Sequence, residues 1–99
     1  MPTYVALLNW TDQGIRGYKD TAKRAEAFAA ATQKLGAKLL NIYWTVGSYD
    51  LVAVVEASDD ETAAAALLQL GGAGNVRTAT LRAFGQEEME RIIAKTTGQ

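Results

Sequence analysis

The 99-residue sequence contains neither cysteine nor histidine. Without cysteine the chain has no disulfide and no thiol nucleophile. Without histidine it lacks imidazole, which is a common general base and the commonest transition-metal ligand among the side chains. A haem held by an axial histidine is excluded. We therefore predict neither a metal site nor a cofactor.

An excess of charge of one sign is also lacking, because 10 Lys and Arg nearly balance 11 Asp and Glu and give a net charge of −1. No basic run appears, so the chain has no field that would gather phosphates, and we expect no nucleic acid or membrane partner. The start "MPTYVALLNW" has no basic leader, and its apolar run is too short for a signal core or a membrane span. The expected compartment is the cytoplasm.

What the chain does have is enough apolar sequence for a core, since 48% of its residues are hydrophobic. We predict a single domain over residues 1–99. A domain of this length buries only about 60 to 65% of the surface that its unfolded chain exposes. Any further apolar surface needs a partner.

The hydrophobic period switches several times along the chain. Thr3 to Trp10 is rich in strand formers, and the following loop allows a helical turn begun by Thr11 or Asp12. The pattern then predicts a helix from Asp20 or Thr21 to Gly36, strands over 38–46 and 49–57 joined at Gly47-Ser48, a helix opened by a Ser58/Glu61 capping box and closed by Gly71-Gly72, a strand over 75–85, and a short C-terminal helix.

This order predicts an α+β fold of the ferredoxin-like type, βαββαβ with a C-terminal helix and a four-stranded antiparallel sheet. Right-handed crossovers place the first and third strands in the centre. Both main helices then lie on one face of the sheet. We expect the other face to be uncovered and to pair with a second copy, or else to be covered by the C-terminal helix. The residues assigned to that face, with the inverse assignment left open because the strand registers are unknown, are Tyr4, Leu8, Trp10, Leu40, Ile42 and Trp44.

Polar and aromatic groups are predicted to converge at one rim of the sheet, because "NWTDQG" ends the first strand and "GSYD" begins the antiparallel third. Each of these groups also has a structural explanation. Asp50 suits a local hydrogen bond to the backbone, Gly47 a positive φ in the turn, and the tryptophans a core or interface. An edge-strand arginine is often simply solvated. The candidate ligand-binding residues are Asn9, Trp10, Tyr43, Tyr49, Asp50 and Arg77, with Gly47 as a structural turn residue.

Three segments, "TYVALLNWTDQG", "VGSYDLVAVVEA" and "GNVRTATLRAF", together resemble the GYD-domain family, over about residues 3 to 85. The resemblance implies a ferredoxin-like fold of the dimeric α/β-barrel group and a largely uncharacterised function, with no catalytic residues to carry over. A looser similarity runs to the effector-binding domains of Lrp/AsnC-type regulators, but the DNA-binding helix-turn-helix of those proteins is missing here. Cofactor-free monooxygenases and isomerases of the same fold group offer a second analogy, in which Asn9, Trp10, Tyr49 and Arg77 take cavity roles.

Two hypotheses about function follow from these residues. The first is a homo-oligomeric module that binds a small molecule or takes part in an interaction. The alternative is a cofactor-independent monooxygenase or isomerase acting on a small aromatic or polar substrate, with a desolvated Asp50 as the base. The first is favoured because no second group that titrates near pH 7 is available to pair with Asp50.

Overall fold

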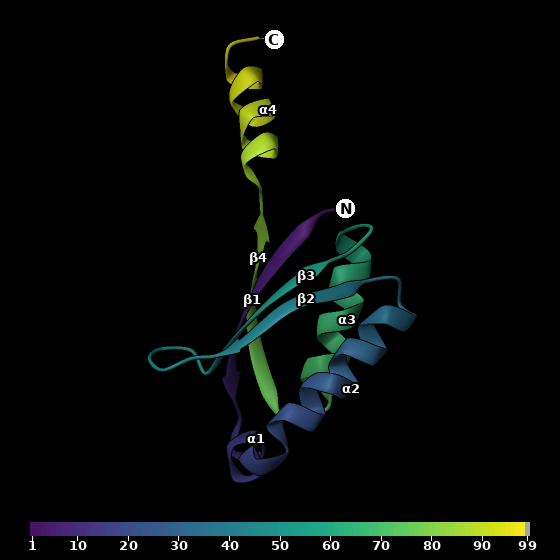
Figure 1. Cartoon of the computed structure of the whole chain (residues 1–99), viewed down its shortest axis with the longest axis vertical. Coiled ribbons are helices and arrows are strands. Elements are labelled where there is room, and N and C mark those ends of the chain that lie inside the picture. The colour runs from purple at the N-terminus through teal and green to yellow at the C-terminus, as the bar shows by residue number, and fades with distance from the viewer. Residues whose placement is uncertain (99) are drawn as a thin grey trace.

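A computed structural model describes residues 1–98 and shows a four-stranded sheet with helices packed on one side (Figure 1). Its elements alternate as the sequence pattern predicts. The helical turn allowed at Thr11 or Asp12 is present as a short helix capped by Thr11, and a 3₁₀ turn follows it. In chain order they are β1 (Thr3–Trp10), α1 (Asp12–Arg16), η1 (Tyr18–Asp20), α2 (Thr21–Lys34), β2 (Lys38–Trp44), β3 (Leu51–Glu56), α3 (Asp60–Gly72), β4 (Val76–Ala83) and α4 (Gln86–Thr96).

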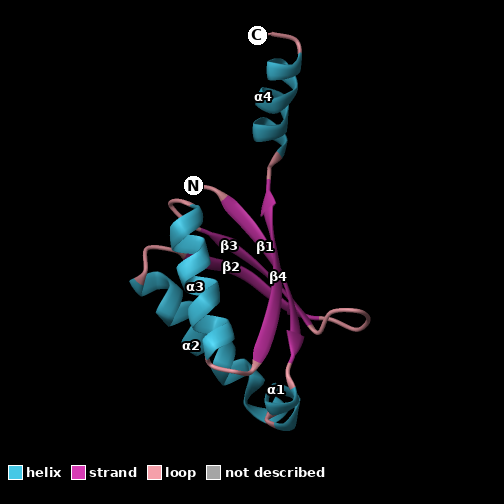
Figure 2. Ribbon diagram, turned by 180° about the vertical axis from the view of Figure 1, so that it is seen from behind, coloured by secondary structure: helices cyan, strands magenta, loops and turns pink. Residues whose placement is uncertain are grey.

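The sheet has the order β2-β3-β1-β4, and each neighbouring pair is antiparallel. The two most apolar strands, β1 and β3, are therefore central, while β2 and β4 form the edges. This arrangement confirms the predicted ferredoxin-like topology. It also confirms the prediction that α2 and α3 share one face, because both lie on the same side of the sheet in Figures 1 and 2.

Of the six residues assigned to the uncovered face, five lie on the covered one, so the inverse assignment is the correct one. Tyr4 and Leu8 are buried beneath the helices, and Trp10 pairs with buried Val76. Ile42 and Trp44 pair with Ala53 and Leu51, which are also buried, whereas Leu40 lies at a register shift between Leu39 and Asn41. Successive side chains of a strand point to opposite faces of the sheet. When both sets of side chains are apolar, the sequence does not indicate which set packs against the helices.

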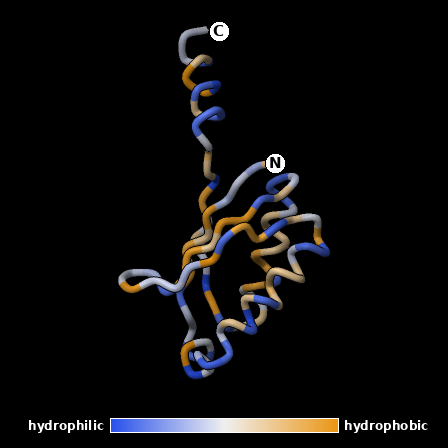
Figure 3. Tube along the Cα trace, in the orientation of Figure 1, coloured by the Kyte–Doolittle hydropathy of each residue, from blue (hydrophilic) through white to orange (hydrophobic). Residues whose placement is uncertain are grey.

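The opposite alternation forms the uncovered side of the sheet, called the open face below. The pairing of residues between neighbouring strands shows that all four strands contribute side chains to the open face. Valine and leucine side chains of the two central strands occupy its middle, and the strands include orange, hydrophobic segments in Figure 3. The residues of the open face are Thr3, Val5, Leu7, Asn9, Lys38, Asn41, Tyr43, Val52, Val54, Glu56, Arg77, Ala79, Leu81 and Ala83.

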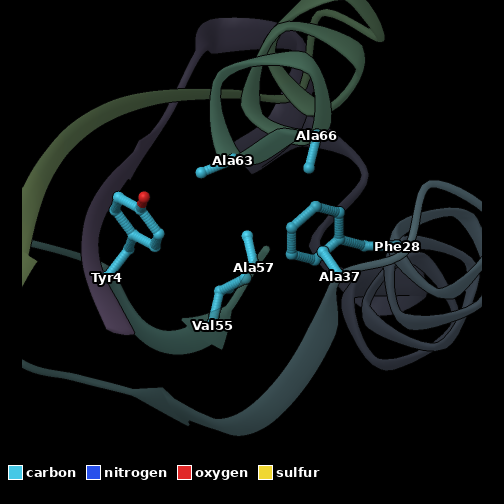
Figure 4. Packing of buried hydrophobic residues seen from close by; sticks show 7 residues of the cluster. All are labelled: Tyr4, Phe28, Ala37, Val55, Ala57, Ala63 and Ala66. Carbon is cyan, nitrogen blue, oxygen red and sulfur yellow. The ribbon is translucent and has the colours of Figure 1, made fainter. Parts of the chain in front are cut away.

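The core lies between the covered face and the two main helices (Figure 4). Phe28 of α2 and Tyr4 of β1 supply its large rings, and alanines of α3 pack above them. The small side chains Ala63 and Ala66 are at most 3% exposed, so α3 lies close to the sheet. The alanines of α3 thus give close packing at one end of the domain.

The hairpin between β2 and β3 is longer than predicted. β2 ends at Trp44 and β3 starts at Leu51, which leaves a loop over 45–50 in place of a two-residue turn. Inside it the Thr45 hydroxyl donates to the Tyr49 carbonyl at 2.6 Å, and the Thr45 amide donates to the Asp50 carbonyl at 2.8 Å. Gly47 has φ of +133°, as the prediction of a positive-φ turn glycine requires.

The cap of α3 also lies one residue later than predicted. Asp59, not Ser58, is the N-cap, and its carboxylate accepts the Thr62 amide at 2.8 Å. This hydrogen bond lowers the pKa of Asp59. A carboxylate at this position also interacts favourably with the positive end of the helix dipole, which the Ser58 hydroxyl cannot match.

The C-terminal helix α4 does not fold across the open face but continues away from the sheet beyond β4 (Figures 1 and 2). The molecule is accordingly elongated, with extents of 52 × 31 × 18 Å. The alternative in which α4 covers its own sheet was therefore wrong. Within residues 1–98, none of the helices has the combined length and hydropathy needed to cross a membrane.

The start of α4 offers a test by pH. Glu88 accepts the Gly85 amide at 3.2 Å and pairs with Arg82 at 3.2 Å, and these contacts lower the pKa of Glu88. A lowered folded-state pKa means that the stabilisation is complete above the ordinary value of about 4.3 and is lost as the pH falls through the lower value. The Gly85 amide shift in NMR spectra should follow this transition. Glu88→Ala should abolish it, whereas Glu87→Gln should leave it in place.

Candidate functional site

The carboxyl end of β1 is held by the start of β4. The Thr11 amide donates to the Asn75 carbonyl at 3.1 Å, and the Thr11 hydroxyl donates to the Gly74 carbonyl at 2.5 Å. The same hydroxyl caps α1 by accepting the Gly14 amide at 3.0 Å. Gly14 is required there because a Cβ atom would lie 1.9 Å from the Asn75 carbonyl oxygen. The chain is thus anchored where β1 passes into α1.

Asp50 links this rim to β3. Its backbone amide donates to the Leu8 carbonyl at 2.9 Å, and its carboxylate accepts the Trp10 amide at 2.9 Å. The segments "NWTDQG" and "GSYD" are therefore neighbours. The carboxylate satisfies a backbone donor at the point where β1 leaves the β1–β3 ladder, which is a structural role of the kind that the sequence allowed.

A cavity of about 230 Å³ lies at this end of the domain, between the covered face and α2 and α3. Its walls are nearly all apolar, and Trp10, Phe28 and Ile42 supply much of them. Concave, mainly apolar sites with a few polar groups are the usual form of small-molecule sites. The residues that line it are Leu8, Trp10, Thr21, Arg24, Ala25, Ala27, Phe28, Ala31, Ile42, Leu51, Ala53, Gln69, Leu70, Ala73, Asn75 and Val76.

Arg24 is the one ionisable side chain among the described residues that line this cavity. Its guanidinium donates to the carbonyl of Gly14 at 3.2 Å and to that of Gly17, so it ties the α1–η1 segment to α2. Its Nε atom is buried without a hydrogen-bond partner among residues 1–98. Arg24 therefore brings a positive charge to a mainly apolar wall.

A second hydrogen bond connects strand β2 to helix α2 at the border of the cavity. The Trp44 indole N–H donates to the Thr21 hydroxyl at 2.9 Å and joins the edge strand to the first residue of α2. Thr21 itself lines the cavity. Strand β2 and helix α2 are thus fixed relative to one another at the border of the cavity.

The predicted site residues do not meet at one point. Trp10 lines the cavity, and Asp50 hydrogen-bonds to the Trp10 amide. Asn9 and Arg77 are paired across β1 and β4 on the open face, where Tyr43 also lies. Tyr49 is in the hairpin loop with 36% of its surface exposed. The cluster expected from the sequence is therefore divided between two sides of the sheet.

Sequence reasoning missed most of the cavity wall, including Arg24, Phe28 and Ile42. One signal was available in the alanines of "AEAFAAATQ", because small side chains on the buried side of a helix leave room against a sheet. Ala25 and Ala31 of α2 line this space. An alanine-rich pattern alone does not tell whether the helix leaves a cavity or packs closely on the sheet. The alanines of α3 pack closely.

The fold and the cavity define an α+β domain of the ferredoxin-like type with a space between the sheet and its helices. The GYD domain model matches residues 4–93, and the chain belongs to the GYD domain family. This membership confirms the resemblance seen in the three sequence segments.

Two relatives from Thermus thermophilus extend the comparison. The chain is 38% identical over 88 residues to a protein named glutamine synthetase and cystathionine beta-lyase binding protein, covering 85% of this chain and 90% of that one. A solved crystal structure from the same organism superposes with a TM-score of 0.57 at 29% identity, over 86% of this chain and 95% of that chain.

A third likeness concerns the fold alone. The crystal structure of MtbAldR superposes with a TM-score of 0.59 at 14% identity, over 86% of this chain and 54% of that chain. The shared part is thus about half of the longer protein.

Asp50 can be tested by comparing two substitutions. Asp50→Ala leaves the Trp10 amide without its acceptor and should lower the free energy of unfolding by about 1–3 kcal/mol. Asp50→Asn keeps an oxygen acceptor and should lose less. Urea denaturation followed by tryptophan fluorescence measures both, with Ser48→Ala in the same loop as a near-neutral control. Equal losses in the two Asp50 variants would assign the stabilisation to charge and not to the hydrogen bond.

Proposed function

We propose that the protein is a homo-oligomeric binding module that holds a small, mainly apolar ligand between its sheet and helices. The observation that carries this proposal is the cavity of about 230 Å³ with its nearly apolar wall. A cavity of this kind is poorly hydrated, so an apolar molecule gains contacts there without displacing well-bound water. Arg24 favours a ligand that joins an apolar body to one anionic or acceptor group.

The homo-oligomeric part of the proposal rests on the open face. Val5, Leu7, Val52 and Val54 form its middle on the two central strands, and Leu81 on β4 is 53% exposed. A contiguous apolar surface of this kind is rare on a monomer and marks an interaction site. A second copy provides the same surface, and two such faces bury one another around a two-fold axis.

The enzyme alternative is less well supported. Proton abstraction requires a base within reach of the substrate. The Asp50 carboxylate instead accepts the Trp10 amide, and no carboxylate is among the described residues that line the cavity. A binding role needs only the shape and polarity of the wall.

A second candidate function is the recruitment of other proteins. It is favoured by the 38% identity to a relative named for binding glutamine synthetase and cystathionine beta-lyase. The loop over 45–50 projects from the sheet in Figure 1 and carries the fully exposed Val46, so it offers a contact point for a larger partner. Ligand binding and protein recruitment are compatible, because the exposed Val46 of the loop is not among the residues that line the cavity.

Ligand binding is testable with small aromatic probes. Benzyl alcohol and benzoate share a ring and differ in charge, so both should shift amide signals around Phe28 and Ile42, with benzoate bound more tightly because of Arg24. Ala31→Leu fills the cavity and should weaken binding at least about tenfold. Ala30→Leu is the matched control, because Ala30 is the exposed neighbour on the same helix. Equal binding by both variants would contradict a site in this cavity.

Self-association is measured separately. Sedimentation equilibrium should give a mass of at least twice 10.6 kDa. Val54→Lys places a charge in the middle of the open face and should shift the protein toward monomer, whereas Glu61→Lys on the exposed first turn of α3 should not. A wild-type protein that sediments as a monomer at all concentrations would overturn the pairing.

A further inference from the structure

Helix α4 carries an apolar stripe that its own domain does not cover. Met89 and Ile93 are 46% and 53% exposed, and half-buried Ile92 lies beside them on the same side of the helix. Polar and charged residues occupy the opposite side, and Figure 3 shows the two kinds alternating along α4. An isolated helix of 11 residues is marginal in water, so a helix of this pattern depends on packing its apolar side against another surface.

Helix α4 points away from its own sheet, and contacts around the connection favour this direction. Only residues 84 and 85 separate β4 from α4. The Arg82 guanidinium lies 4.5 Å from the centroid of the Phe84 ring and pairs with Glu88 at 3.2 Å, while the Gly85 amide donates to Glu88 at 3.2 Å. These contacts lie on both sides of the connection, and they hold α4 as a continuation of β4.

The area of the open face gives a reason for α4 to contact a second copy. Four strands spaced about 4.8 Å apart, each about seven residues long at roughly 3.3 Å per residue, cover about 440 Å² in plan. Taken as flat, two such faces in contact cover about 900 Å², whereas a standard stable interface buries roughly 1,200–2,000 Å² of accessible surface. On this flat-area estimate, sheet pairing alone falls short of a standard interface.

Two α4 helices make up the difference. A helix of 11 residues is about 16 Å long at 1.5 Å per residue and roughly 10 Å wide. Each helix then covers about 160 Å², and we count an equal area on the other copy that it contacts. Two helices therefore add about 650 Å² to the area of the paired sheets, and the total reaches the range of a standard interface. Exposed apolar side chains also follow one another along the chain from the sheet to α4, from Leu81 of the open face through Phe84 in the connection to Met89.

We propose that α4 is an exchanged arm: in a pair of copies, each α4 packs Met89, Ile92 and Ile93 against the other copy, beside the paired open faces. This proposal rests on the homo-oligomer proposed above. The second copy is the occupant because it alone provides both the complementary open face and a reciprocal arm, so one two-fold contact covers both exposed surfaces.

Dissociation measurements separate the arm from the sheet contact. Met89→Glu/Ile93→Glu should weaken dimerisation at least about tenfold, because it places two charges in the contact. Arg91→Glu on the polar side of α4 changes the net charge by the same −2 and should leave dimerisation near wild type. Sedimentation velocity over a concentration series gives the constants. A double variant that dimerises like wild type would overturn the arm and leave the sheet pairing intact, whereas a monomeric wild type would overturn both.

Exchange itself is visible by paramagnetic NMR, since the chain has no cysteine to compete for a label. Spin-labelled Glu87→Cys protein with natural isotopes is mixed with ¹⁵N-labelled protein that carries no spin label. We expect broadening of amide signals in the ¹⁵N copy, which only a contact between copies produces. A label on Lys23→Cys in α2, on the covered side of the sheet, serves as the control and should broaden fewer signals. Dimers without broadening from position 87 would show that α4 stays with its own copy.

Discussion

The structure depends on one imbalance: a sheet that is apolar on both faces receives helices on only one of them. α2 and α3 cover the face that carries Tyr4, Leu8 and Val55, and α4 leaves the body instead of covering the other. The covered face provides the core of a single copy. The open face keeps apolar side chains in contact with water, and removing them from water is the driving force for the proposed assembly.

The covered side is not packed evenly, and this difference sets where a ligand site lies. Near the end of β1 a cavity remains between the sheet and the helices, while Ala63 and Ala66 bring α3 close to the sheet at the other end. Hydrogen bonds at the border keep the space in shape, from Arg24 to the carbonyls of the α1 segment and from Trp44 to Thr21. A pre-formed cavity of this kind loses little conformational entropy on binding.

The turn from Gly47 to Asp50 has a structural explanation. Gly47 takes a positive φ, and Asp50 hydrogen-bonds to the amide of Trp10 on the neighbouring strand. Tyr49 remains exposed in the loop. The glycine and the aspartate therefore fix where β3 begins against β1, and through that contact they position Trp10 in the cavity wall. The motif acts on the site through the backbone.

The sequence by itself determined the order of elements and the central place of β1 and β3, because periodicity and end signals are local, and it excluded imidazole and thiol chemistry. The hairpin length and the direction of α4 were not predictable, since they depend on the bond from Asp50 to β1 and on the pairing of Arg82 with Glu88. Only the tertiary structure decided which alternation of each strand meets the helices, and so separated Trp10 in the cavity from Asn9 on the open face. The physical reason is that a period of two leaves both faces of an all-apolar strand equivalent until the helices pack on one of them.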